Sequence, residues 1–102
     1  MNQEEAKEIL ANRVRQLKKL PYSEFRAWVI EKKIETPVAN GPSGTEYQIE
    51  IQAMWDSKRR GDIRVFVSVD DGGLVSSLMP LCDSFVVSSD GSIVGPRGKS
   101  PG

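Results

Sequence analysis

The spacing of apolar residues changes near residue 33, and this change constrains the fold more than any other feature of the sequence. Before it, apolar residues recur every three or four positions, which is typical of helices with one buried face. After it, they recur at every second position, which is typical of strands in a sheet with one buried face. The chain is therefore expected to form an α+β fold in which helices precede an antiparallel sheet.

Two helices are expected before the change. The first covers residues 3–19, and its apolar stripe consists of Ala6, Ile9, Leu10, Val14 and Leu17. Asn2 is suited to cap its N-terminus, and Pro21 ends it because the residue before a proline disfavours helical dihedrals. Ser23 is the expected N-cap of a second helix over residues 24–32. The buried side of that helix is expected to contain Phe25, Trp28 and Val29.

A hairpin is the clearest feature of the expected sheet. Its first strand covers residues 47–55, with an apolar row of Tyr47, Ile49, Ile51, Ala53 and Trp55. Its second strand follows the polar turn 56–62, with an apolar row of Ile63, Val65, Val67 and Val69. A register that opposes Trp55 with Ile63 places both rows on one face, which is expected to face the helices.

Further strands are expected on either side of this hairpin. Residues 34–39 fit a first strand, in which Pro37 suits an edge position. Residues 84–88 fit a later strand, and Asp90-Gly91 is typical of a tight turn into residues 92–94. Residues 74–82 form an apolar connection whose structure the pattern does not indicate.

The architecture follows from the need to bury these apolar rows. An amphipathic sheet must cover its apolar face, and the two helices carry the apolar surface for this. We expect two N-terminal helices packed on one face of a four- to five-stranded, mainly antiparallel sheet. With 102 residues, the chain suits a single domain over residues 1–95, followed by a frayed tail over residues 96–102.

Composition bears on location and on ligand class. The net charge is zero, whereas nucleic-acid binders usually carry a basic excess, so nucleic acid is disfavoured. The single cysteine, the absence of a signal-like start and the lack of any apolar run of about 20 residues favour a cytoplasmic protein without a membrane segment. Neither membrane binding nor a cofactor is expected.

Three stretches resemble small uncharacterised bacterial α+β proteins of unknown function. They are residues 47–55, residues 63–73 with the ending Val-Asp-Asp-Gly-Gly, and residues 84–95 with Asp-Gly-Ser-Ile-Val-Gly. The resemblance covers roughly residues 20–95 and rests mostly on strand and turn residues. It implies the fold, but no activity, cofactor or site residue.

The residue types that most enzymes need are scarce. The chain has no histidine, which excludes Ser-His-Asp and Cys-His dyads and histidine-based zinc sites. Cys82 is expected to be a buried or inert thiol, because unpaired cysteines are among the most buried residues. Catalytic and metal-ligating residues are therefore not assigned.

Two alternative functions remain open. Asp70, Asp71 and Asp83 could serve a small metal- or acid-dependent enzyme, although adjacent residues in a strand point to opposite faces and Asp-Asp-Gly-Gly is typical of a strand end. The basic turn Lys58-Arg59-Arg60 could make a weak nucleic-acid contact, although a solvated turn also explains it.

The leading hypothesis comes from the other face of the sheet. In the register above, Met54 lies opposite Arg64 and Gln52 lies opposite Phe66. An aromatic residue, a methionine and an arginine together are typical of protein-contact patches. We therefore expect a non-enzymatic interaction or accessory domain that uses this outer face or a sheet edge. The partner would be another protein or a second copy of the chain, unless the C-terminal segment covers the patch.

Overall fold

The computed structural model describes residues 3–56, 61–72 and 81–94. Within these ranges the chain forms two helices followed by six strands: α1 (Gln3–Leu17), α2 (Tyr22–Glu31), β1 (Ile34–Glu35), β2 (Val38–Asn40), β3 (Glu46–Trp55), β4 (Ile63–Asp70), β5 (Leu81–Val87) and β6 (Ile93–Val94). The strand order is β1-β3-β4-β5-β6, and β2 also pairs with β3. Every pairing is antiparallel.

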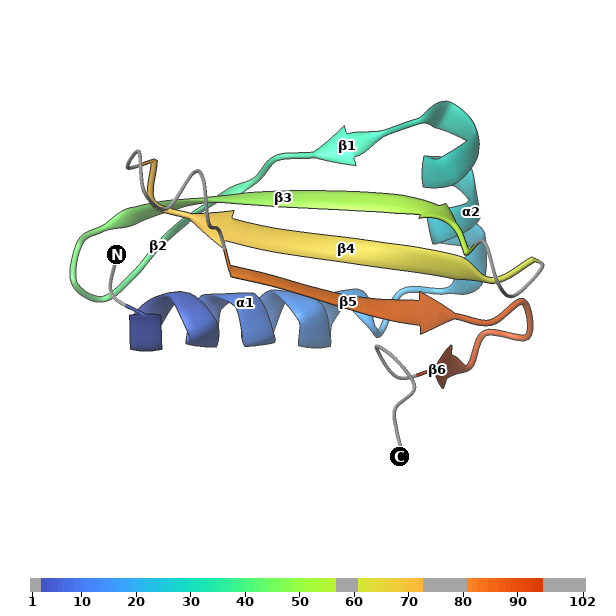
Figure 1. The fold of residues 1–102 in the computed structure, drawn as a ribbon, viewed down its shortest axis with the longest axis horizontal. Coiled ribbons are helices and arrows are strands. Elements are labelled where there is room, and N and C mark those ends of the chain that lie inside the picture. The colour runs from blue at the N-terminus through green and yellow to red at the C-terminus, as the bar shows by residue number, and fades with distance from the viewer. Residues whose placement is uncertain (1–2, 57–60, 73–80, 95–102) are drawn as a thin grey trace.

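The predicted α+β architecture is confirmed. Both helices lie on the same face of the sheet (Figure 1), where α1 packs against β4 and β5 and α2 packs against β3 and β4. No described segment covers the opposite face, which we call the outer face. The sheet has six strands rather than the predicted four to five, because the strand expected over residues 34–39 is divided into β1 and β2.

The predicted hairpin register is also confirmed. Trp55 pairs with Ile63 and Ile49 pairs with Val69, so the apolar rows of β3 and β4 share the face toward the helices. A slip by one residue would move both rows to the outer face, so burial of these rows fixes the register. The same alternation continues into β5, where Phe85 lies opposite Val65.

The core lies between this face and the two helices. Its fully buried aromatic side chains are Phe25, Tyr47 and Phe85. The ring of Phe25 meets those of Trp28 and Phe85 edge to face, with centroid distances of 5.5 Å and 6.1 Å. The predicted apolar sides of both helices are confirmed, since Ala6, Leu10, Val14 and Leu17 of α1 are buried as well.

One of the predicted helix ends is wrong. Helix α2 begins at Tyr22, with Pro21 in the cap position and no side-chain cap, rather than after Ser23. The Tyr22 hydroxyl donates a hydrogen bond to the carbonyl of Gly61, which lies just before β4. This contact joins residues that are far apart in the chain.

The last long strand begins earlier than predicted. Strand β5 starts at Leu81 rather than Ser84, because Leu81, Cys82 and Asp83 pair with β4. Cys82 lies opposite Ser68 and is exposed, so of the two expected states, a buried or an inert thiol, the buried one is wrong. The predicted cap Asn2, the basic turn 58–60, residues 74–80 of the apolar connection and the tail 96–102 lie outside the described residues.

Candidate functional site

The outer face is built from alternate residues of the three longest strands. Because side chains alternate between faces along a strand, the residues between the buried ones point to the outer face. They include Gln48, Glu50, Gln52 and Met54 of β3, Arg64, Phe66, Ser68 and Asp70 of β4, and Cys82 and Ser84 of β5. Val86 of β5 pairs with Arg64 and shares this face, but its side chain is buried. This face is mixed in character, with charged, polar and apolar side chains.

The four residues of the predicted patch lie next to one another in the structure. Met54 pairs with Arg64 and Gln52 pairs with Phe66, so the four side chains are neighbours on two adjacent strands. Met54 and Phe66 are each 38% exposed, whereas Gln52 and Arg64 are half-buried. We call this group the outer-face patch. Two apolar side chains are thus exposed beside a partly buried guanidinium.

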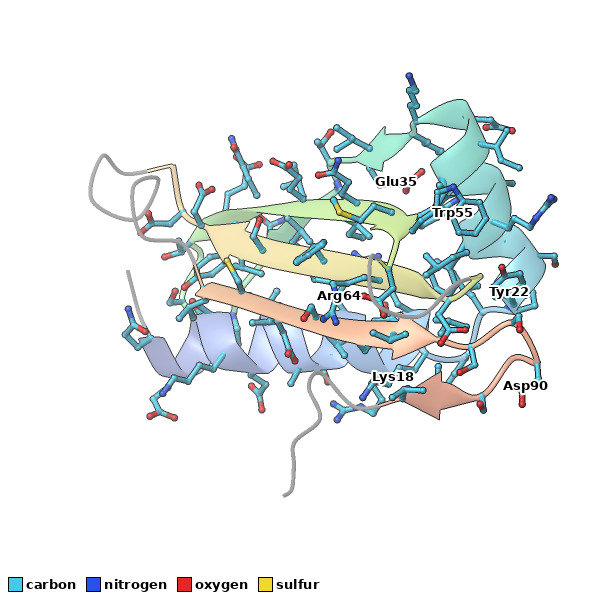
Figure 2. All side chains as sticks on the ribbon, turned by 45° about the vertical axis from the view of Figure 1, so that its right-hand side comes forward. Lys18, Tyr22, Glu35, Trp55, Arg64 and Asp90 are labelled. Carbon is cyan, nitrogen blue, oxygen red and sulfur yellow. The ribbon has the colours of Figure 1, made fainter. Side chains whose placement is uncertain are left out.

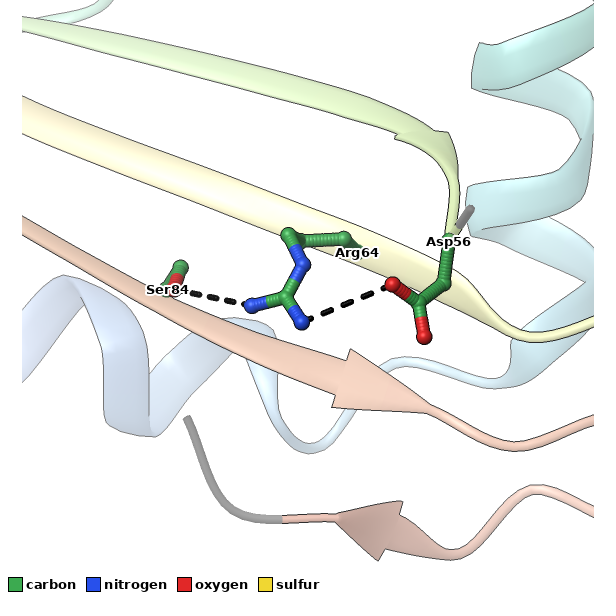
Figure 3. Close-up of polar contacts among 3 residues, drawn as sticks. All are labelled: Asp56, Arg64 and Ser84. Carbon is green, nitrogen blue, oxygen red and sulfur yellow. Dashed lines mark hydrogen bonds and ion pairs between the residues drawn. The ribbon is translucent and has the colours of Figure 1, made fainter. Parts of the chain in front are cut away.

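Arg64 is held in place on the surface of the sheet. Its Nη2 lies 3.5 Å from Asp56 Oδ1, and its Nη1 donates to Ser84 Oγ at 3.4 Å (Figure 3). Asp56 follows the last residue of β3, and its N–H donates to the Asp62 carbonyl at 2.9 Å. Within the described residues, Asp56 Oδ2 is buried and has no hydrogen-bond partner. The Asp56 carboxylate therefore depends on Arg64 for charge compensation.

Sequence reasoning missed two apolar side chains beside the patch. Ile34 pairs with Gln52 and Val38 pairs with Gln48, so both lie on the outer face at its edge. They are 50% and 52% exposed. Their strand was predicted, but its register on β3 was not, and without the register the face of each side chain is undetermined. With them, the apolar surface extends across β1, β3 and β4.

Trp55 departs from its predicted environment. Its register places it on the face toward the helices, yet it is 46% exposed. Strand β1 begins opposite Gln52, so no residue of β1 lies beside Trp55. The side chain instead lies beside α2 (Figure 2). There it borders a hollow of about 440 Å³ between the end of α2 and the ends of β1 and β3. Val29, Lys32 and Ile34 are among the residues that line it.

The aspartates of the enzyme hypothesis are not brought together. Asp70 pairs with Gln48 on the outer face, whereas Asp83 pairs with Val67 and so belongs to the opposite face. Asp70 Oδ1 accepts from the Gly72 N–H at 2.8 Å, and Asp83 Oδ1 accepts from the Ser84 N–H at 2.8 Å. Within the described residues, no group of three potential metal ligands is found.

A second polar cluster joins the N-terminus of α1 to the loop after β2. Glu5 Oε1 accepts from the hydroxyls of Ser43 and Tyr47, both at 2.7 Å, and Glu5 Oε2 accepts from the Ser43 N–H at 2.9 Å. A Cβ on Gly41 would lie 2.3 Å from the Glu5 carboxyl carbon, so a larger residue there would displace the Glu5 carboxylate. These contacts connect the N-terminus of α1 to the loop after β2 and to β3.

The hydrogen bonds of this cluster shift two pKa values. The Ser43 hydroxyl, the Tyr47 hydroxyl and the Ser43 N–H lower the pKa of Glu5. Burial, followed by the hydrogen bond to Glu5 and its charge, raises the pKa of Tyr47 to about 12. Both shifts favour the same pair of protonation states, an ionised Glu5 and a neutral Tyr47. The contribution of this cluster to the free energy of unfolding therefore depends on pH.

We expect the free energy of unfolding to fall in acid because of Glu5. A carboxyl whose pKa is lower in the folded state contributes stability above its unfolded pKa, and this contribution is lost as the pH falls through the folded pKa. Urea unfolding at a series of pH values below neutrality should show the loss, and Glu5→Gln should show a smaller one. Equal acid dependence in the two proteins would contradict a stabilising role for ionised Glu5.

Comparison of the chain with protein-family models, with curated proteins and with solved structures gives no match. No described helix is long and apolar enough to cross a bilayer.

Proposed function

We propose that this chain is a non-enzymatic protein-interaction domain that contacts another protein through the outer face of its sheet. The contact centres on the outer-face patch of Gln52, Met54, Arg64 and Phe66. The observation that carries the proposal is the exposure of Met54 and Phe66 side by side on a sheet face that no described segment covers.

The composition and geometry of the patch support this proposal. Phenylalanine, methionine and arginine are enriched at protein interfaces, and the patch joins all three with an amide side chain. Arg64 lies against Asp56 and Ser84, so part of its side chain is fixed before any partner binds. A side chain that is already ordered loses less conformational entropy on binding. Ile34 and Val38 extend the apolar surface toward one edge.

The alternatives have weaker support in the described residues. An enzyme that uses Asp70, Asp71 and Asp83 would need their carboxylates to converge, but Asp70 and Asp83 belong to opposite faces of the sheet. Nucleic-acid contact through residues 58–60 concerns a turn outside the described ranges. A protein contact needs neither feature.

Phe66→Ala is the direct test of the proposed contact. We expect the variant to fold normally, since Phe66 is partly exposed, and to bind a protein partner roughly tenfold or more weakly, as expected for a central aromatic contact. Pulldown followed by isothermal titration with the purified partner measures the change.

Gln48→Ala is the matched control, because Gln48 is exposed on the same face of β3 but lies outside the patch. It should bind like the wild type. Equal affinity of Phe66→Ala and the wild type for every captured partner would contradict the proposal.

A further inference from the structure

Strands β1 and β2 together form one edge of the sheet, and only residues 36–37 separate them. Strands β1 and β2 keep the same register on β3: Glu35 pairs with Ile51 and Val38 pairs with Gln48. Between them, the Ile49 N–H donates to the Pro37 carbonyl at 2.9 Å. Residues 34–40 therefore act as one strand, which we call the β1–β2 edge.

The backbone groups of this edge point in alternate directions. In an antiparallel strand, the N–H and C=O of each residue point to the same side, and successive residues point to opposite sides. The bond between Ile49 and Pro37 shows that the odd-numbered residues of the edge face β3. The N–H and C=O groups of Ile34, Thr36 and Val38 therefore point away from the sheet. Pro37, which has no N–H, is one of the residues that face β3. All three outward-facing residues therefore keep their N–H groups.

The side chains of the outward row suit another strand. Ile34, Thr36 and Val38 are all β-branched, the type that fits best beside a neighbouring strand, and all three are exposed. Natural edges usually carry a lysine, an outward proline or another feature that blocks pairing. The opposite edge shows such a feature, because the carboxylate of Asp83 accepts the N–H of Ser84 at 2.8 Å. The β1–β2 edge has no comparable contact among the described residues.

The outward-facing residues of the β1–β2 edge can also pair with the same residues of a second copy. When two copies of the edge run antiparallel about an axis at Thr36, Ile34 of one copy lies opposite Val38 of the other. This arrangement also brings the end of α2, where Lys32 is the left-handed C-cap, toward the Asn40 end of the other copy, where Asn40 pairs with the exposed Glu46. Lys33 already forms an ion pair with Glu35 at 2.9 Å, whereas Lys32 has no ion pair in the described part of the chain. The basic end of each edge thus lies near an acidic residue of the other copy.

We propose that a second copy of this chain pairs with the β1–β2 edge, antiparallel and about a two-fold axis at Thr36. The two sheets then form one continuous sheet with all helices on the same side, and the two outer faces become one surface. This self-pairing goes beyond the contact proposed for the outer-face patch and does not depend on it.

Sedimentation equilibrium over a concentration range that reaches about 1 mM tests the proposal. We expect the wild type to dimerise reversibly. Thr36→Pro removes one outward N–H, which the chain's own sheet does not use, and should raise the dissociation constant at least tenfold. Thr36→Val keeps the N–H and the β-branched shape, so it should dimerise like the wild type. Circular dichroism of Thr36→Pro checks that the variant is folded.

Three further variants test the pairing even if Thr36→Pro does not fold. Val38→Lys places a charge at an exposed edge position and should also weaken the dimer, even if Thr36→Pro fails to fold. Lys32→Glu should weaken it, and adding Glu46→Lys in the same chain should restore it if the register is as proposed.

Three results would overturn the self-pairing. They are a wild type that stays monomeric across the range, a dimer that neither Thr36→Pro nor Val38→Lys weakens, and a dimer that Phe66→Ala alone abolishes. The last result would place the self-contact on the outer-face patch and would support the proposed function. Loss of a separate protein partner in Phe66→Ala with an intact dimer would support both proposals.

Discussion

Replacing Phe25 with alanine is expected to lower the free energy of unfolding by about 3–5 kcal/mol. The Phe25 ring is fully buried and lies edge to face against both Trp28 and Phe85. It therefore connects α2 to β5 across the core. Removing it leaves a cavity and also eliminates two aromatic contacts, which contribute beyond the buried area. Chemical denaturation of the variant and the wild type measures the difference.

Ile30→Ala is the matched control on the same helix. Ile30 is apolar but mostly exposed, so its replacement should change the free energy of unfolding by no more than about 0.5 kcal/mol. Similar losses in the two variants would show that α2 does not pack through its Phe25 side, and the placement of the helices on one face would be in doubt.

The sequence pattern predicted those parts of the fold that burial alone determines. The apolar rows of residues 47–55 and 63–70 have only one register in which both are covered, so the pairing of Ile49 with Val69 could be predicted. The helices followed from their stripes for the same reason. Met54, Arg64, Gln52 and Phe66 were then placed on the outer face by alternation.

The parts that could not be predicted depend on contacts between distant segments. Tyr22 at the start of α2 donates a hydrogen bond to Gly61, and the start of β5 depends on the pairing of Leu81 with Val69. Trp55 is exposed because β1 does not extend beside it. The place of Ile34 and Val38 beside the patch depends on the register of the edge, which no apolar row determines.

The two proposed contacts use different physical features of the same sheet. The outer-face patch offers side chains, whose affinity for a partner depends on shape and on aromatic contact. The β1–β2 edge offers backbone groups, whose pairing requires another strand but little sequence specificity. A dimer through the edge would present two outer-face patches on one side of a continuous sheet. A partner with two matching sites would then bind more tightly through effective concentration, without any additional contact in either patch.

Ile51→Ala and Glu50→Ala together test the assignment of faces on which both contacts depend. Ile51 is 1% exposed and pairs with the buried Val67, so its truncation is expected to lower the free energy of unfolding by about 2–5 kcal/mol through lost burial and a residual cavity. This is a large share of the stability of a small domain.

Glu50 is the neighbouring residue on the outer face, and it is exposed opposite Ser68. Its replacement should change the free energy of unfolding by no more than about 0.5 kcal/mol, as for other surface sites. Urea denaturation at low protein concentration, where self-association does not contribute, compares the two variants. Comparable losses, or a larger loss for Glu50→Ala, would mean that the faces of β3 are interchanged. Met54 and Phe66 would then belong to the core, and an exposed patch could not be formed from them.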